Sequence, residues 1–251
     1  MTGRAAYPRR QALILFAIGV PATLAVLPYQ LALQPALLER APLPALLLGA
    51  TFNSAIEVGV AVGLGLLAAR EVGLRSPISE AIAAGGDVPV AVRAVDAPRA
   101  VLLGASSAIL VLVLNSTVFG AVATGLASAG AAVPSRLIGF LASFEGGITE
   151  EILFRLFAMS VIVWLLSRIW GQRPAGIFWA ANIAVAVLFG LAHLPATAAL
   201  IPLTPLVVVR AIVLNGLVGV VAGWLYWRRG LESAMVAHFA ADLVVHVLVA
   251  A

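Results

Sequence analysis

The chain has 251 residues, of which 63% are hydrophobic and 10% are charged. Soluble domains carry roughly 25% charged residues, so this composition excludes an ordinary soluble domain. The net charge of +4 comes from arginine, because the chain has no lysine, and there is no cysteine. The arginines flank apolar runs without an interleaved aromatic patch, which excludes a nucleic-acid partner, and the lack of thiols excludes disulfides.

Seven apolar segments, each close to the roughly 20 residues that cross a bilayer, follow one another along the chain. They predict an all-α fold, namely a polytopic transmembrane helical bundle of seven or eight membrane helices surrounded by the lipid bilayer. The predicted segments are 11–33, 45–69, 100–124, 137–167, 175–198, 205–227 and 231–251.

The whole chain, residues 1–251, is predicted to be a single integral-membrane domain. Its first apolar segment is too long for the core of a signal peptide, so we expect it to be retained. Residues 1–136 contain the N-terminal spans and a polar connector at 70–99, and residues 137–251 contain the motif-bearing catalytic core.

The fourth apolar segment is longer than one bilayer crossing needs. It contains the adjacent glycines Gly146 and Gly147, and glycine weakens a helix interior, so this pair is a candidate helix break. An eighth membrane helix would result if residues 137–145 formed a helix of their own.

The distribution of arginines predicts the orientation of the chain. A cytoplasmic N-terminus leaves only Arg40, Arg136 and Arg210 on the outer side, and the positive-inside rule favours this arrangement. We therefore expect a multi-pass protein of the plasma (inner) membrane. The arginines expected on the inner side are Arg4, Arg9, Arg10, Arg70, Arg75, Arg93, Arg99, Arg168, Arg173, Arg228 and Arg229.

Two adjacent glutamates lie in the fourth segment, although a carboxylate at the centre of a bilayer costs about 2.5–3.5 kcal/mol. Glu151 and Arg155 are four residues apart on one helical face, in the favourable order, so Glu151 is predicted to be the charge-compensated member. Glu150 points about 100° away and is the candidate general base. The structural alternative is a buried ion cluster that locks helices together.

The three histidines of the chain, His193, His238 and His246, all lie downstream of these glutamates in apolar segments. His238 and Asp242 share one face of the last helix, and His246 continues the same stripe without an assigned role. The alternative for each histidine is an interhelical hydrogen bond. His193 and His238 meet only if the fifth helix continues past Pro195 or tilts strongly, and we predict that Pro195 bends that helix rather than ends it.

These residues resemble a known family. The motifs Glu150-Glu151-x-x-x-Arg155, Phe189-x-x-x-His193 and His238-x-x-x-Asp242 are similar, in this order, to those of the CAAX-protease and bacteriocin-processing (CPBP) family of intramembrane endopeptidases, which includes type II CAAX prenyl endopeptidase. The similarity covers residues 137–246.

The resemblance implies a membrane-embedded protease that hydrolyses a peptide bond of a membrane-associated or lipidated peptide. By similarity, Glu150 and His193 would activate the attacking water, while His238 and Asp242 would stabilise the oxyanion or bind a metal. The supporting positions would be Glu151, Arg155 and Phe189.

The resemblance leaves the cofactor open between none and one Zn²⁺. Zinc accepts imidazole and carboxylate ligands, and the candidate ligands are Glu150, His193, His238 and Asp242. The enzyme would accordingly be of the glutamic type or a metalloprotease.

Two functions of other classes fit the same residues. Intramembrane glutamate, histidine and aspartate can form an ion or proton relay in a transporter or channel. The chain could equally serve as an immunity or scaffold protein that binds a peptide without cleaving it.

Overall fold

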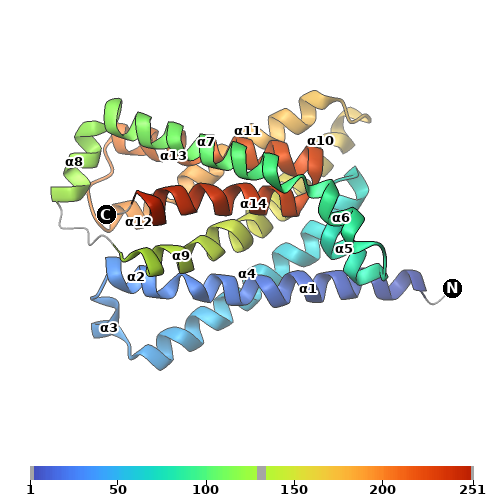
Figure 1. Cartoon of the computed structure of the whole chain (residues 1–251), viewed down its shortest axis with the longest axis horizontal. Coiled ribbons are helices and arrows are strands. Elements are labelled where there is room, and N and C mark those ends of the chain that lie inside the picture. Colours follow the sequence, from blue (N-terminus) through green and yellow to red (C-terminus); the bar gives the residue numbers. More distant parts are fainter. Residues whose placement is uncertain (1–2, 129–133, 250–251) are drawn as a thin grey trace.

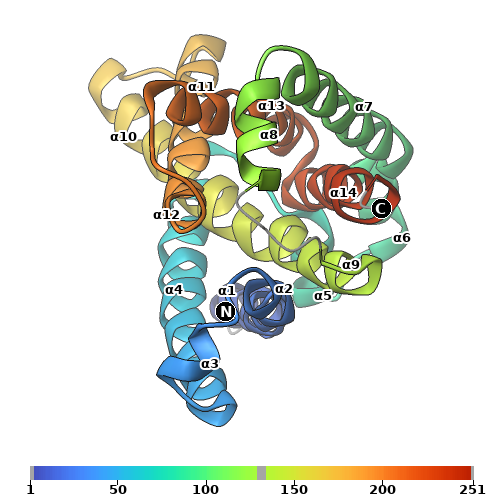
Figure 2. The same ribbon diagram turned by 90° about the vertical axis from the view of Figure 1, so that its left-hand side faces the viewer.

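The computed structural model describes residues 3–128 and 134–249, which are mostly helical and contain no strand. Most of the helices run side by side along the long axis, whereas α3 and the start of α4 extend away from the others (Figures 1 and 2). The elements are α1 (Gly3–Ala25), α2 (Leu27–Leu33), α3 (Leu37–Arg40), α4 (Leu43–Val72), α5 (Pro77–Ala84), α6 (Val88–Val95), α7 (Ala97–Thr117), α8 (Gly120–Ser128), α9 (Arg136–Phe144), η1 (Glu145–Glu150), η2 (Ile152–Met159), α10 (Ser160–Trp170), α11 (Ala175–Ala192), α12 (Leu194–Ala198), α13 (Pro205–Arg229), α14 (Leu231–Asp242) and η3 (Leu243–Leu248).

Within the described residues, 7 segments are long and apolar enough to cross a membrane, which confirms the predicted polytopic all-α bundle. Residues 250 and 251 of the last predicted segment lie outside the described residues. The seven segments are Arg9–Leu33, Leu43–Val72, Val88–Thr117, Arg136–Trp170, Ala175–Ala198, Pro205–Arg229 and Leu231–Leu248.

The third span was predicted wrongly at both ends. The expected segment was 100–124, but the helix ends at Thr117 and α8 follows as a separate helix. The Thr117 Oγ1 donates a hydrogen bond of 2.6 Å to the carbonyl oxygen of Val113, and such side-chain bonds compete with the helical ladder. Apolar residues continue across this turn, so hydropathy alone could not locate it.

The polar connector predicted at 70–99 is a folded element rather than a loop, because it contains α5 and α6. Gly73 and Gly85, with φ of 79° and 67°, end the preceding helices in the left-handed conformation that glycine tolerates. The Asp87 carboxylate caps α6 by accepting a hydrogen bond of 2.9 Å from the backbone N–H of Val90.

The fourth span does not break at Gly146 and Gly147. It is one helix of 35 residues that widens to π-helical geometry through η1 and η2, so no separate eighth span forms among the described residues. The glycines instead allow a close helix contact, since a Cβ on Gly147 would lie 2.8 Å from Cβ of Phe239 on α14. Wide helical turns of this kind are rare and concentrate at functional sites.

The fifth span continues past Pro195, as predicted. α11 ends at Ala192, His193 is the junction residue, and α12 carries the helical path to Ala198. The backbone N–H of Thr197 donates a hydrogen bond of 3.2 Å to the carbonyl oxygen of His193, which keeps the path helical across the proline.

Polar contacts join several helix ends at one end of the bundle. Arg70 Nη2 donates a hydrogen bond of 2.8 Å to Gln11 Oε1, and Gln11 Nε2 donates one of 3.2 Å to Ser79 Oγ. The backbone N–H of Leu231 donates one of 3.0 Å to the carbonyl oxygen of Arg75. We call this the arginine-rich end; its arginines are Arg9, Arg10, Arg70, Arg75, Arg93, Arg99, Arg168, Arg173, Arg228 and Arg229.

Gly104 allows α7 to pack against α14, the helix that carries His238. A Cβ at position 104 would collide with the carbonyl oxygen of Ala237 and lie 2.9 Å from its Cα. We expect Gly104→Ala to force the helices apart and to lower the free energy of unfolding by about 1–3 kcal/mol, measured as a lower thermal midpoint in detergent.

The matched control is Gly63→Ala on α4, because a Cβ there meets no atom within 4 Å. Alanine also has the higher helix propensity, so this variant should unfold at the same temperature as the wild type or slightly above it. Equal midpoints for Gly104→Ala and Gly63→Ala would contradict the predicted collision.

Candidate active site

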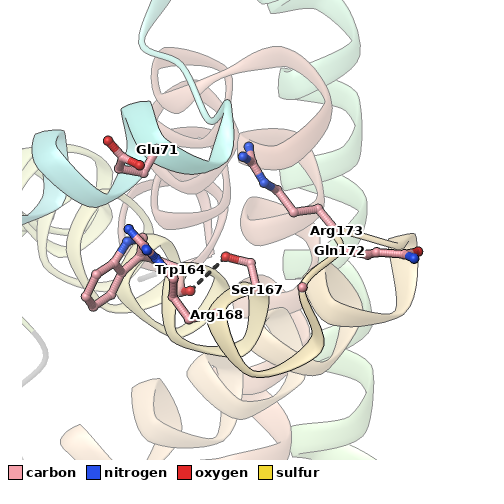
Figure 3. A pocket seen from close by; sticks show the side chains of 7 residues that line it. Glu71, Trp164, Ser167, Arg168, Gln172 and Arg173 are labelled. Carbon is pink, nitrogen blue, oxygen red and sulfur yellow. Dashed lines mark hydrogen bonds between the residues drawn. The ribbon is translucent and has the colours of Figure 1, made fainter.

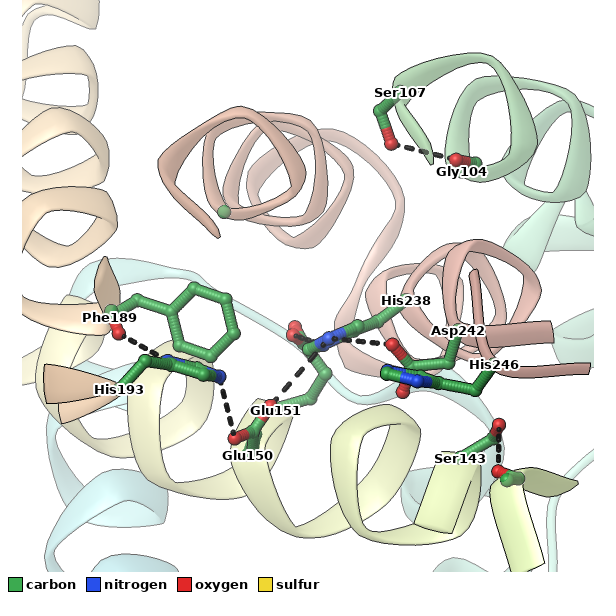
Figure 4. A network of polar contacts seen from close by, with 12 residues as sticks. Gly104, Ser107, Ser143, Glu150, Glu151, Phe189, His193, His238, Asp242 and His246 are labelled. Atoms are coloured by element: carbon green, nitrogen blue, oxygen red, sulfur yellow. Dashed lines mark hydrogen bonds and ion pairs between the residues drawn. The ribbon is translucent and has the colours of Figure 1, made fainter. Parts of the chain in front are cut away.

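The wide helix directs its two adjacent glutamates to different environments. The Glu151 side chain is fully buried, whereas the Glu150 side chain keeps 16% of its surface exposed. Glu151 ends up inside the protein, where a carboxylate needs a counter-charge. Glu150 lies at the edge of the cluster shown in Figure 4.

The predicted pair of Glu151 and Arg155 is confirmed, with 3.2 Å between Glu151 Oε2 and Arg155 Nε. The Arg155 side chain is buried, and its Nη2 donates a hydrogen bond of 3.2 Å to the carbonyl oxygen of Gly219 on α13. Its guanidinium lies 5.1 Å from the centre of the Phe189 ring, within the range of a cation–π contact. The arginine therefore connects the fourth span to α11 and α13.

The ring of Phe189 separates the two imidazoles of the cluster. Its centre lies 4.8 Å from that of His193 and 5.5 Å from that of His238, and both contacts are edge-to-face. The Phe154 ring packs against Phe189 in the same manner at 5.0 Å. Phe189 is itself buried, so it fixes the spacing of the two histidines through packing.

His193 lies at the junction of α11 and α12. Its Nδ1 is 2.8 Å from the carbonyl oxygen of Phe189, and because a carbonyl only accepts, Nδ1 carries the proton. The other ring nitrogen, Nε2, lies 3.8 Å from Oε1 of Glu150. The neutral ring therefore presents an acceptor nitrogen toward that carboxylate.

His238 on α14 is oriented in the same way by a different acceptor. Its Nδ1 lies 2.8 Å from Oε1 of Glu151, so this nitrogen donates to the carboxylate. Its Nε2 lies 3.6 Å from Oε2 of Glu150 and 3.8 Å from Oδ1 of Asp242. Figure 4 shows the two imidazoles on opposite sides of Glu150.

The structure thus brings together the four residues predicted as catalytic. The two Nε2 atoms face the same carboxylate, that of Glu150, from helices that are far apart in the sequence. Their distances to the carboxylate exceed those of direct hydrogen bonds, which are about 2.7–3.2 Å. A small polar molecule such as water could bridge groups at this separation.

The predicted zinc ligands do not form a metal site as arranged. Zinc holds its ligand atoms at about 2.0–2.2 Å, which places neighbouring donors roughly 3.3 Å apart. The corresponding pairs here are 3.6–3.8 Å apart, and among residues 3–128 and 134–249 no three His, Asp or Glu side chains are placed to hold a metal ion.

Several residues near the site belong to none of the three family motifs. The hydroxyl of Tyr29 on α2 lies 3.4 Å from Nδ1 of His246, and the two rings meet edge to face. A Cβ on Gly146 would collide with the Asp242 carboxylate, so a side chain there would displace that carboxylate from its place beside His238. The double glycine before Glu150 was the sequence signal for this close approach, although it suggested a break instead.

The comparison with known protein families matches residues 132–244 to the Rce1-like model, described as type II CAAX prenyl endopeptidase Rce1-like. Residues 132–244, somewhat less than half of the chain, are thus similar to the Rce1-like family. The match confirms the family resemblance and includes all three motifs. The match to this family supports membrane protease activity in general. Neither the curated proteins nor the solved structures yield a match.

The buried Glu151 should matter more for the stability of this Rce1-like segment than its partly exposed neighbour, Glu150. We expect Glu151→Gln to destabilise the protein by about 3–5 kcal/mol, because Arg155 would keep its buried charge without a counter-ion. Thermal unfolding in detergent measures the effect. Glu150→Gln is the matched control, since Glu150 has no arginine partner, and it should unfold close to the wild type. Equal destabilisation by both substitutions would argue against this division of roles.

Proposed function

We propose that the protein is an intramembrane endopeptidase that hydrolyses a peptide bond of a membrane-associated or lipidated peptide with a water activated by Glu150 and His193. The observation that supports this most is the convergence of two imidazole Nε2 atoms on the carboxylate of Glu150. In both rings an acceptor engages Nδ1 and leaves Nε2 directed at the site. The similarity to the Rce1-like family supports the same reaction class.

The hydrolysis begins with a water held between Glu150 and His193 Nε2. As its oxygen attacks the scissile carbonyl carbon, the Glu150 carboxylate takes the proton of the water. When the tetrahedral intermediate collapses, the C–N bond breaks and Glu150 returns this proton to the leaving nitrogen. One group thus serves first as general base and then as general acid.

The negative charge on the carbonyl oxygen of the intermediate needs a donor. His238 can supply it through Nε2–H when the ring is protonated to the imidazolium, because Glu151 accepts its Nδ1–H and fixes the ring. Oδ1 of Asp242 lies 3.8 Å from that Nε2, beyond a direct hydrogen bond, and a carboxylate cannot donate to an oxyanion, so its charge can only face the imidazolium. Asp242 is therefore assigned as a positioning residue for His238, and Arg155 keeps Glu151 in place.

The decisive experiment uses the full-length protein in nanodiscs and a library of membrane-tethered peptides with and without a lipid group. Removing a general base lowers a rate by about 10²–10⁴-fold, so Glu150→Gln should lose cleavage to that extent while remaining folded. Glu57→Gln is the matched control, because Glu57 is an exposed carboxylate of the second span with no contact to the histidines. Unchanged cleavage by Glu150→Gln would reject the proposal. It would also be rejected if the wild type cleaved no peptide but carried an ion flux that Glu150→Gln abolished.

The metal content of the protein tests whether side chains or a metal ion activate the water. With side-chain activation, the purified protein should contain no stoichiometric metal, and a chelator should leave the cleavage rate unchanged. Elemental analysis and cleavage rates before and after chelation give both readings. One zinc per chain, with activity lost on chelation and restored by zinc, would replace this mechanism by a metalloprotease one.

A further inference from the structure

A second polar site lies between the end of α4 and the turn that joins α10 to α11 (Figure 3). It is a pocket of about 350 Å³ that shares no residue with the glutamate–histidine cluster. Most of its lining is polar or charged, which is unusual for a surface that borders lipid. The lining side chains are Glu71, Trp164, Ser167, Arg168, Gln172 and Arg173.

The turn that forms one wall of the pocket has a fixed shape. Gly171 adopts a φ of 67°, a left-handed conformation that ends α10 and favours glycine. Its backbone N–H donates a hydrogen bond of 3.0 Å to the carbonyl oxygen of Ser167. Pro174 then precedes α11, so the segment with Gln172 and Arg173 is held between two helix ends.

The two arginines of the pocket, Arg168 and Arg173, form no ion pair with a carboxylate among the described residues. Arg168 lies 5.5 Å from the centre of the Trp164 ring, a cation–π contact that leaves its N–H groups available. Among the residues that the structure describes, Arg173 has no hydrogen bond or ion pair, and Glu71 has none either. Guanidinium groups match the geometry of phosphate oxygens, so the pocket is suited to a phosphate group.

The pocket lies at the level where lipid headgroups are expected. Tryptophans gather at membrane–water interfaces, and all 5 tryptophans of the chain lie toward the arginine-rich ends of α10, α11 and α13. Leu165 and Ile169, on α10 beside the pocket, are 48% and 74% exposed, which provides an apolar path next to the charged site. The tryptophans are Trp164, Trp170, Trp179, Trp224 and Trp227.

We propose that this pocket binds a glycerophospholipid whose headgroup carries a phosphate and a primary amine, as in phosphatidylethanolamine. Arg168 and Arg173 bind the phosphate, and Glu71 accepts hydrogen bonds from the ammonium group. The acyl chains follow Leu165 and Ile169. A simple anion has no group that pairs with Glu71, which is why the arrangement favours a zwitterionic headgroup. This proposal does not depend on the proposed protease function.

The test measures the lipid retained by the full-length protein after reconstitution in phosphatidylcholine nanodiscs that contain phosphatidylethanolamine or phosphatidylglycerol. The wild type should retain phosphatidylethanolamine in preference to both other lipids. Each of Arg168→Gln and Arg173→Gln should lower that retention about fivefold, the effect of one arginine on an interfacial lipid. Glu71→Gln should abolish the preference over phosphatidylglycerol while lipid still binds.

The matched control is Arg228→Gln, because Arg228 lies 5.3 Å from the Trp227 ring at the same end of the bundle but outside the pocket. The side chains changed in the four variants are exposed, namely those of Glu71, Arg168, Arg173 and Arg228. Unchanged thermal midpoints would show that the variants are folded. Equal retention by the pocket variants and Arg228→Gln would overturn the proposal. Displacement of the lipid by inorganic phosphate would also overturn it, since the site would then be one for free phosphate.

Discussion

One buried carboxylate, that of Glu151, holds the candidate active site together. One of its oxygens accepts the Nδ1–H of His238, and the other faces the guanidinium of Arg155. A charge at this depth is tolerated only with partners, and here the partners come from two helices. Through Arg155 the same carboxylate is also linked to the backbone of α13 and the ring of Phe189. The geometry around Glu150 therefore depends on its neighbour in the chain.

Close helix contacts provide the second requirement of the site. Gly146 and Gly147 lie where α14 approaches the wide part of the fourth span, and Gly104 allows α7 to approach α14 from another side. Without side chains at these positions, the backbones come near enough for His238 to reach both glutamates. Glu150 and Glu151 point to different sides because they are adjacent in a helix, and the π-helical widening keeps that helix continuous through the contact with α14.

Most of the spans and the pair of Glu151 and Arg155 could be predicted from the sequence, because they follow from local patterns, whereas the meeting of Glu150 with the two histidines was expected from the family resemblance. Apolar length identifies a membrane helix, and a spacing of four places Glu151 beside Arg155. The widening of the fourth span could not be predicted, since it depends on packing against helices distant in the sequence. The connector at 70–99 was predicted as a polar loop, and its two short helices were missed because charged residues interrupt their apolar pattern. The acceptor of the His193 proton is a backbone oxygen, which no side-chain motif reveals.

The length of α4 has a consequence for the surrounding membrane. Its 30 residues extend about 45 Å, whereas the hydrocarbon core of a bilayer is about 30 Å thick. Leu48 and Phe52 near the start of α4 are exposed. This part of the helix extends away from the other helices (Figure 2). Such hydrophobic mismatch is relieved when the helix tilts or when nearby lipids stretch to match it. We therefore expect the bilayer beside α3 and the start of α4 to adapt its thickness to this helix.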